Sequence, residues 1–237
     1  STSRGLGDVY KRQYKNNTKM FNGVLRKMIT ELKDPVNYFL DMGNDFIVFN
    51  SIIENNITIE FDGYSCLNCC SNQEIYRQGY CKKCFFDLPS TADWVMKPEM
   101  SKAHLDIEER DLDYEKKVQL QPHVVYLAYT SGIKVGVTRK SQVPTRWIDQ
   151  GASQAIILAE VPNRRFSGDI EVALKQHISD KTNWRKMLSA ESESVDMLKI
   201  KNQLSNYVPN ELKKFISNDN KEWPNPELYL KCSKFNA

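Results

Sequence analysis

The chain has 237 residues, of which 41% are hydrophobic and 27% are charged, and its mean hydropathy is -0.56. These values predict a soluble globular protein, exclude a globally disordered or collagen-like chain, and leave no apolar run near the about 18 residues that a membrane-spanning helix needs. The formal net charge of +3 is too small to indicate a nucleic-acid partner by itself.

Residues 1–13 (STSRGLGDVYKRQ) differ from the rest of the chain. They lack apolar periodicity and the apolar centre of a secretory signal, and they resemble the translated read-through of a sequencing adapter. We therefore expect a non-native leader, with a disordered tail as the alternative, and leave this segment out of the fold prediction. It contributes +2 of the net charge of +3.

Residues 14–121 are expected to form a mixed N-terminal region with a connector at its end. Apolar residues at helical spacing predict a helix over residues 20–32, which ends before Pro35. Residues 46–53 and 56–61 are rich in β-branched and aromatic residues and predict two strands. The charge run over residues 107–117 predicts a solvated helix or loop.

Four of the 6 cysteines form two CxxC pairs, Cys66 with Cys69 and Cys81 with Cys84, and eleven residues separate the pairs. Thiolates bind zinc well, and two such turns joined by a short hairpin close a tetrahedral site with no open position. We therefore predict a structural zinc ribbon over residues 64–86, with unliganded thiols or a redox pair as the alternatives. Cys70 is a possible substitute for Cys69. Without a secretory signal, a reducing cytoplasm is the expected location.

Residues 122–188 are the most regular part of the sequence. Strands are predicted over residues 123–129, 133–138 and 155–161, with a helix starting at Pro144 and another from an N-cap at Ser167 to Ile178. The order is β-β-α-β-α. A helical extension over residues 189–237, with helices at 195–204 and 209–216, completes an α+β fold.

Two short motifs fall on the first two predicted strands of this region, Val124-Val125-Tyr126 and the later segment 134–138 (KVGVT). They resemble the paired strands of the GIY-YIG endonuclease superfamily, in the branch whose second motif reads Lys-Ile-Gly-x-Thr. Arg146 and Glu171 follow on the next two predicted helices. The chain departs from the pattern at Val124, where the superfamily has Gly, and at Lys134, where a Tyr is usual. The whole chain also resembles an uncharacterised bacterial domain-of-unknown-function family with upstream zinc cysteines.

The resemblance implies a nuclease that hydrolyses phosphodiester bonds with Mg²⁺ or Mn²⁺. Glu171 would hold the metal, Arg146 would grip phosphate oxygens, Tyr126 would orient or deprotonate water, and Lys134 would contact phosphate. The chemistry agrees with these residue types, because a carboxylate suits a hard cation and a guanidinium binds phosphate bidentately.

The charge distribution is uneven. Residues 134–186 carry ten Lys and Arg but five acidic residues, a local excess of +5. Such a bias favours phosphate contacts. The side chains expected to bind DNA or RNA are Lys134, Arg139, Lys140, Arg146, Arg164, Arg165 and Arg185.

Two other interpretations stay open at this point. In the first, the chain is a non-catalytic, zinc-containing nucleic-acid-binding protein. In the second, it is a scaffold in which Arg146 and Glu171 form an internal ion pair. Convergence of Tyr126, Lys134, Arg146 and Glu171 in one place favours the nuclease.

Overall fold

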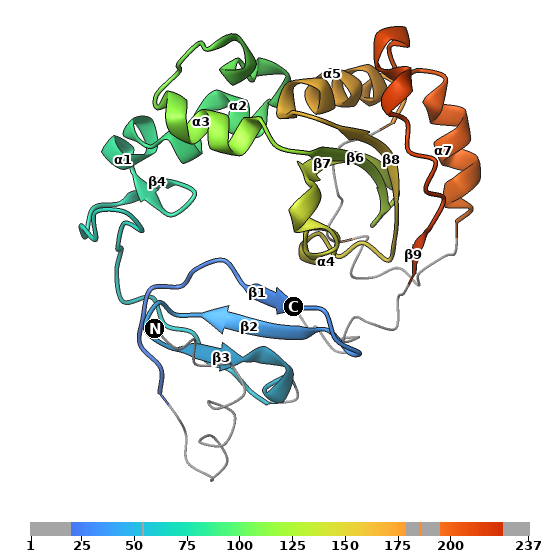
Figure 1. Ribbon diagram of the computed structural model, residues 1–237. Coiled ribbons are helices and arrows are strands. Elements are labelled where there is room, and N and C mark those ends of the chain that lie inside the picture. Colours follow the sequence, from blue (N-terminus) through green and yellow to red (C-terminus); the bar gives the residue numbers. More distant parts are fainter. Residues whose placement is uncertain (1–19, 54, 179–184, 186–194, 225–237) are drawn as a thin grey trace, which may run out of the picture.

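The computed structural model describes residues 20–53, 55–178, 185 and 195–224. The expected leader over residues 1–13 lies outside this part of the chain. The described residues form a mixed α+β fold, as predicted, with three small antiparallel sheets of strand orders β1-β2-β3, β4-β5 and β7-β6-β8-β9 (Figure 1). No described helix is long and apolar enough to cross a lipid bilayer.

The four-stranded sheet forms the centre of the fold. β6 (His123–Tyr129) lies between β7 (Ile133–Arg139) and β8 (Gln154–Val161), and β9 (Trp223–Pro224) pairs with the outer side of β8. From His123 to Ala128, β6 is buried throughout, as expected for a strand that is covered on both faces. The three strands predicted here are confirmed.

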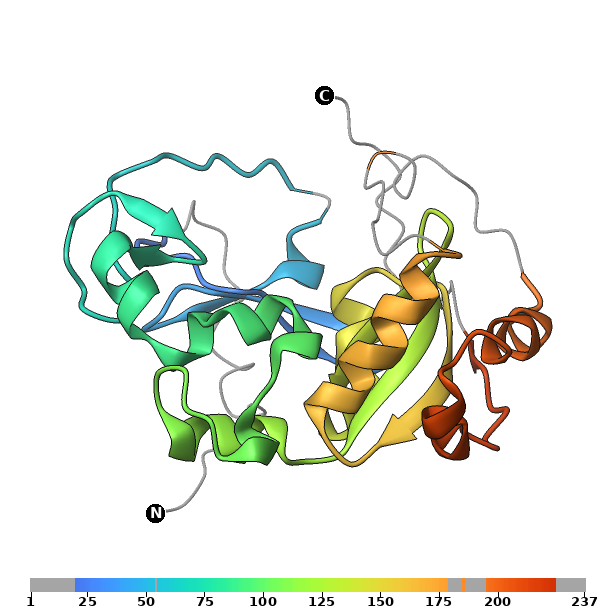
Figure 2. The same cartoon turned by 90° about the horizontal axis from the view of Figure 1, so that it is seen from above.

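Helices cover both faces of this sheet. α4 (Thr145–Asp149) packs Trp147 against Val124 and Tyr126 on one face. α5 (Arg164–Lys175) and α7 (Met197–Ser205) cover the other face (Figure 2). Ile170 and Met197 from these helices join the larger core. The final predicted helix is the 3-10 helix η8 (Asn210–Phe215).

The predicted start of α5 at Ser167 is wrong. The helix begins one turn earlier, because the Asn163 side chain accepts a hydrogen bond of 3.0 Å from the Phe166 N–H and caps it. The Ser167 hydroxyl instead donates to the carbonyl of Arg164 at 2.6 Å, inside the first turn.

The predicted helix over residues 20–32 is also wrong. Residues 20–28 have no regular secondary structure, and β1 (Ile29–Glu31) pairs with β2 (Asn37–Asp41), which pairs with β3 (Phe46–Val48). Leu25 and Ile29 are more than half exposed, so no core receives the apolar stripe that the helix would have presented. The β-branched Ile29 and Thr30 pair with Phe39 and Tyr38 instead.

The segment over residues 56–61 is not a strand. All of its residues are exposed, and it pairs with no strand in the described part of the chain, so its alternating pattern has no sheet edge to join. The strand expected over residues 46–53 ends at Val48, where the 3-10 helix η3 (Phe49–Ser51) begins.

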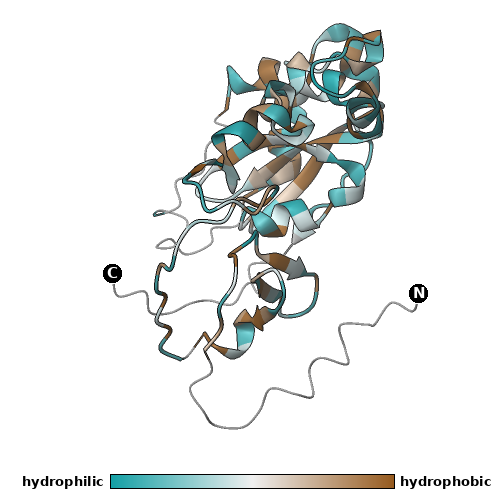
Figure 3. Cartoon of the chain, turned by 90° about the vertical axis from the view of Figure 1, so that its left-hand side faces the viewer, coloured by the Kyte–Doolittle hydropathy of each residue, from teal (hydrophilic) through white to brown (hydrophobic). Residues whose placement is uncertain are grey.

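The N-terminal sheet is tied to the central sheet through α4. The Asp149 carboxylate accepts a hydrogen bond of 3.1 Å from the Thr30 hydroxyl and forms an ion pair with Lys27. Figure 3 shows that the helices of the chain carry both hydrophilic and hydrophobic residues, as expected when one side of each helix is buried.

α1 (Lys82–Asp87) ends the cysteine segment. The connector that follows, from Pro89 to β6, holds several short elements: η4 (Pro89–Thr91), α2 (Asp93–Met96), η5 (Pro98–Met100), η6 (Ala103–Leu105) and α3 (Leu112–Gln119). The charge run is not wholly solvated, because Glu115 is 1% exposed. Its carboxylate accepts hydrogen bonds from the backbone N–H groups of Glu109, Arg110 and Asp111.

The connector docks on α5 by an unusually close backbone approach at Gly168. A Cβ atom at this position would lie 2.1 Å from the Glu99 nitrogen and 2.5 Å from the Pro98 carbonyl carbon. Arg164, one turn earlier, donates to the carbonyls of Trp94 at 3.1 Å and Val95 at 2.7 Å. The segment from α2 to η5 is therefore held against α5 at two adjacent turns.

We predict that Gly168→Ala destabilises the protein. The new methyl group collides with backbone atoms, which should lower the free energy of unfolding by about 1–3 kcal/mol. This loss should outweigh the about 1 kcal/mol by which alanine favours a helix over glycine. Gly132→Ala is the matched control, because nothing lies within 4 Å of its Cβ position. Equal unfolding free energies for the two variants in urea would contradict the role of Gly168.

Candidate metal centre and phosphate-handling site

The cysteine segment is built on a tight hairpin. β4 (Ile75–Arg77) and β5 (Tyr80–Cys81) are joined by Gln78 and Gly79, with φ values of 53° and 85°. Two consecutive positive φ angles are typical of a type I′ turn. A side chain at Gly79 would collide with Leu67, whose Cδ1 lies 2.3 Å from the Cβ position. The hairpin thus brings the second cysteine pair back to the first.

The four predicted zinc ligands come together. The Sγ atoms of Cys66, Cys69, Cys81 and Cys84 all lie within 4.8 Å of one another, and those of Cys69 and Cys81 are 3.8 Å apart. Zinc–sulfur bonds of about 2.3 Å in a tetrahedron place sulfurs about 3.8 Å apart, so the four side chains fit a zinc ion. The prediction of a cysteine cluster that can bind a metal such as zinc is confirmed.

Backbone donors favour the thiolate form of Cys66. Burial raises the pKa of its thiol, but the backbone N–H groups of Cys69, Cys81 and Asn68 outweigh that effect and lower the pKa to about 6. The Cys81 N–H lies 3.3 Å from this sulfur. Since thiolates are the metal-binding form of cysteine, the local backbone is already arranged for a ligand.

We predict that Cys69→Ser loses the metal and Cys70→Ser keeps it. Cys70 is exposed, has a φ of 56° and does not belong to the cluster, although it follows Cys69 directly. The measurement is zinc per chain after dialysis against a weak chelator, with thermal unfolding as a second readout, because structural zinc contributes folding free energy. Equal zinc contents in the two variants would show that the assignment of Cys69 is wrong.

Tyr126 and Arg146 lie together on the α4 side of the central sheet. The Tyr126 hydroxyl donates to Gln150 Oε1 at 3.0 Å, and its ring packs edge-on against Trp147. Burial raises the pKa of Tyr126, while the Arg146 guanidinium lowers it and the Glu171 charge raises it. The phenol is therefore neutral near pH 7, which suits a hydrogen-bonding role.

The position of the Tyr126 ring requires a glycine at residue 136. The two residues are cross-strand partners, and a Cβ at Gly136 would lie 2.6 Å from both Cζ and the hydroxyl oxygen of Tyr126. The tyrosine ring therefore lies directly over the β7 backbone, where a larger residue has no room. This close packing explains the glycine of the second motif.

Glu171 projects from α5 and is 8% exposed. Burial raises the pKa of its carboxyl group, the Lys175 ammonium lowers it, the Glu99 carboxylate raises it further, and Arg164 lowers it. Lys175 Nζ lies 3.5 Å from one carboxylate oxygen. Glu171 thus belongs to a small cluster of charged groups beside the sheet.

Arg146 does not pair with Glu171. Arg146 is exposed, and none of the ion pairs between described residues includes it. The scaffold interpretation, which required a buried pair of these two residues, is therefore wrong on this point.

The predicted phosphate-binding side chains fall into different surroundings. Lys140 is exposed and pairs with Glu160 at 2.6 Å, while Arg165 forms two bonds to Asp169, at 2.9 and 3.0 Å. Arg164 binds the two carbonyls of α2. Lys134 is 7% exposed, Arg139 is partly buried and Arg185 is exposed.

Two residues near this cluster escaped the sequence analysis. Glu99 lies in η5, outside the predicted nuclease-like region, and its Oε2 atom is buried without a hydrogen-bond partner in the described residues. His123 begins β6 and is fully buried, and its Nε2 atom is likewise unpartnered. Neither residue stands in a motif or in a periodic pattern, so no local signal marked them.

His123 should make folding stability pH-dependent. Burial lowers the pKa of its imidazole from 6.5 to about 4, and the charges of Arg164 and Arg139 act in the same direction. Between these values the unfolded chain binds a proton that the folded chain does not, so stability falls as pH falls.

We predict that wild type loses about 3 kcal/mol between pH 6.5 and 4 relative to His123→Gln. The measurement is urea unfolding at several pH values for both proteins. Parallel curves for the two proteins would contradict the assignment of this loss to His123.

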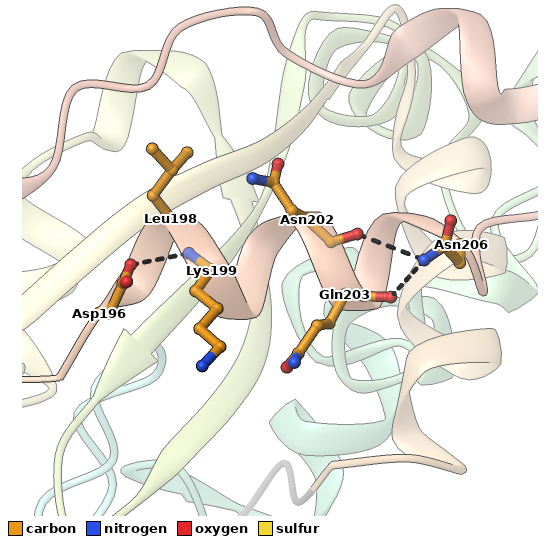
Figure 4. A pocket seen from close by; sticks show the side chains of 6 residues that line it. All are labelled: Asp196, Leu198, Lys199, Asn202, Gln203 and Asn206. Atoms are coloured by element: carbon orange, nitrogen blue, oxygen red, sulfur yellow. Dashed lines mark hydrogen bonds between the residues drawn. The ribbon is translucent and has the colours of Figure 1, made fainter.

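Two surface hollows lie around α7. One is lined by Asp196, Leu198, Lys199, Asn202, Gln203 and Asn206 (Figure 4). A second lies between this helix and the end of α5, where His177 stacks on Tyr207 with ring centroids 3.6 Å apart. Neither hollow includes Tyr126, Arg146 or Glu171.

Comparison with known proteins places most of the chain in one family. The family model described as "Protein of unknown function (DUF2797)" matches residues 54–233, which include the cysteine cluster, the connector and the central sheet. No curated protein and no solved structure matches the chain.

Proposed function

The chain belongs to the DUF2797 family, and we propose that it is a metal-dependent nuclease of the GIY-YIG type with a structural zinc ribbon. Its substrate would be DNA or RNA. The observation that carries the proposal is the position of the Tyr126 hydroxyl, which lies over Gly136 and donates to Gln150 at the end of α4, the helix that carries Arg146. The charges of Arg146 on α4 and Glu171 on α5 both act on the pKa of this phenol.

The topology supports the resemblance. The paired motifs fall on β6 and β7, with β6 in the middle of an antiparallel arrangement and β8 on its other side. α4 and α5 follow in the order that the superfamily pattern requires. The glycine of the second motif lies beneath the tyrosine of the first, so the two motifs form one packed unit.

The residues suit the hydrolysis of a phosphodiester. The water oxygen forms a bond to phosphorus, and the bond between phosphorus and the leaving oxygen breaks. The attacking water loses one proton to solvent, and the leaving oxygen takes up one proton from solvent. Arg146, exposed and without an ion pair in the described residues, is available to grip two non-bridging oxygens. Neutral Tyr126 would orient the water or a phosphate oxygen through its hydroxyl group.

Glu171 is the residue that would hold the divalent cation. A bound Mg²⁺ or Mn²⁺ offsets the negative charge that develops on phosphate. Burial and the nearby Glu99 charge make the ionised Glu171 carboxylate costly, and a cation would relieve that cost. Lys134 and Arg139 on β7 would add phosphate contacts, and the zinc ribbon would remain structural.

One observation favours the alternative of a non-catalytic nucleic-acid-binding protein. Lys175 lies 3.5 Å from Glu171 Oε2, so an ammonium group already partly satisfies the carboxylate that the cation needs. In this alternative Arg146 and the β7 cations would bind phosphate without cleavage. Binding that weakens with salt, with no cleavage in Mg²⁺ or Mn²⁺, selects it.

We predict that Arg146→Ala lowers cleavage of plasmid, single-stranded DNA or structured RNA by about 10²–10³-fold in Mg²⁺. The reason is the loss of the guanidinium that would stabilise charge on the phosphate. Rates are compared at saturating substrate in zinc-loaded protein, and Glu171→Gln should be at least as impaired.

The matched control is Lys33→Ala, because Lys33 forms a surface ion pair with Glu31 of β1, outside the proposed site. Its cleavage rate should remain within about twofold of wild type, in keeping with the small contribution of surface ion pairs. Undiminished cleavage by Arg146→Ala or Glu171→Gln would overturn the proposed active site.

A further inference from the structure

We infer that Glu99 supplies a second carboxylate to the divalent cation assigned to Glu171. The inference rests on the proposed function for the presence of that cation, and it adds a ligand from the connector. The active site would then extend beyond residues 122–188 and would include the 3-10 helix η5.

The close approach at Gly168 places the two carboxylates near each other. Gly168 and Glu171 are three residues apart on α5, so they lie on the same side of the helix, about 5–6 Å apart at Cβ. The Cβ position of Gly168 lies 2.7 Å from Glu99 Cα. Glu99 therefore contacts α5 within one helical turn of Glu171, and its charge raises the pKa of Glu171.

The unpartnered oxygen of Glu99 points to a ligand. Oε2 is buried, and no hydrogen-bond donor of the described residues reaches it. A buried carboxylate oxygen without a donor costs free energy, because its hydration is lost and not replaced. Glu171, itself buried, adds a like charge nearby, and the strain of two adjacent carboxylates is relieved when both bind one cation.

The basic side chains of the cluster do not supply that partner. Arg164 directs its hydrogen bonds to the carbonyls of Trp94 and Val95, and Lys175 forms its ion pair with Glu171. Neither of them donates a hydrogen bond to Glu99 Oε2. A hard divalent ion that takes oxygen ligands from both carboxylates, with water in its remaining positions, matches this donor set.

The test is Mn²⁺ binding by the full-length, zinc-loaded protein without nucleic acid, measured from the electron paramagnetic resonance signal of free Mn²⁺. We expect one site in wild type, and affinity at least about tenfold weaker in both Glu99→Gln and Glu171→Gln, since affinity follows the number of charged ligands. Glu211→Gln, which changes an exposed glutamate of η8, is the matched control and should bind like wild type.

Thermal unfolding separates loss of a ligand from loss of the fold. In buffer without a divalent ion, Glu99→Gln should unfold at the wild-type temperature or above it, because a like-charge contact is removed. Added Mn²⁺ should then raise the unfolding temperature of wild type and of Glu211→Gln, but not that of Glu99→Gln.

Wild-type Mn²⁺ affinity in Glu99→Gln, with weakened binding in Glu171→Gln, would overturn the inference and leave the proposed function standing. Mn²⁺ binding that depends on both glutamates, in a protein that cleaves no nucleic acid, would uphold the inference and overturn the nuclease. A wild-type protein that binds no Mn²⁺ would overturn both.

Discussion

Arg164 and Gly168 together determine how the two halves of the fold meet. Arg164 donates to two carbonyls at the end of α2, and its guanidinium carbon lies 5.6 Å from the centre of the buried Trp94 ring. One turn later, the absent side chain of Gly168 admits the backbone of η5. The guanidinium of Arg164 and the absence of a side chain at Gly168 thereby hold the connector against α5. Burial disfavours the charged guanidinium there and lowers the pKa of Arg164 to about 10.

This contact also shapes the electrostatics of the candidate site. The charges of Arg139 and Arg146 lower the pKa of Arg164, while those of Glu171 and Glu99 raise it. Positive and negative groups are therefore crowded in one region and partly compensate each other. The net charge of +3 does not indicate this grouping of charges, because residues that are far apart in the sequence come together only in the folded chain. A phosphate approaching Arg146 would meet a guanidinium that forms no ion pair within the described residues.

Local sequence patterns predicted the parts of the fold whose contacts are local. β6, β7 and β8 follow from buried or alternating apolar runs, and the cysteine cluster follows from two CxxC turns around a hairpin. The helix expected over residues 20–32 failed because apolar spacing is necessary for a packed helix but does not provide the surface that it packs on. The pairing of Ile29 with Phe39 supplied a competing structure that periodicity does not register.

The roles of Glu99 and Gly168 could not be predicted, because they depend on one contact between residues 69 positions apart. A lone glycine in a helix indicates only a local cost or a close approach, and it does not name the segment that approaches. The same holds for the start of α5, where Asn163 and Ser167 are both acceptable caps by residue type. The backbone path out of β8 decides in favour of Asn163, and that path is a tertiary property.

A continuous set of contacts joins the cysteine cluster to the charged groups around Glu171. Cys84 lies in α1, and the carbonyls of Phe85 and Leu88 that follow it accept hydrogen bonds from the Arg110 side chain. The chain then passes through α2, where Arg164 binds it, to Glu99 beside α5. A zinc ion bound to the four cysteines would therefore order one end of a segment whose other end carries Glu99. A metal with no open coordination position would then still influence the candidate site, because it would limit the conformations of the segment that carries the Glu99 carboxylate.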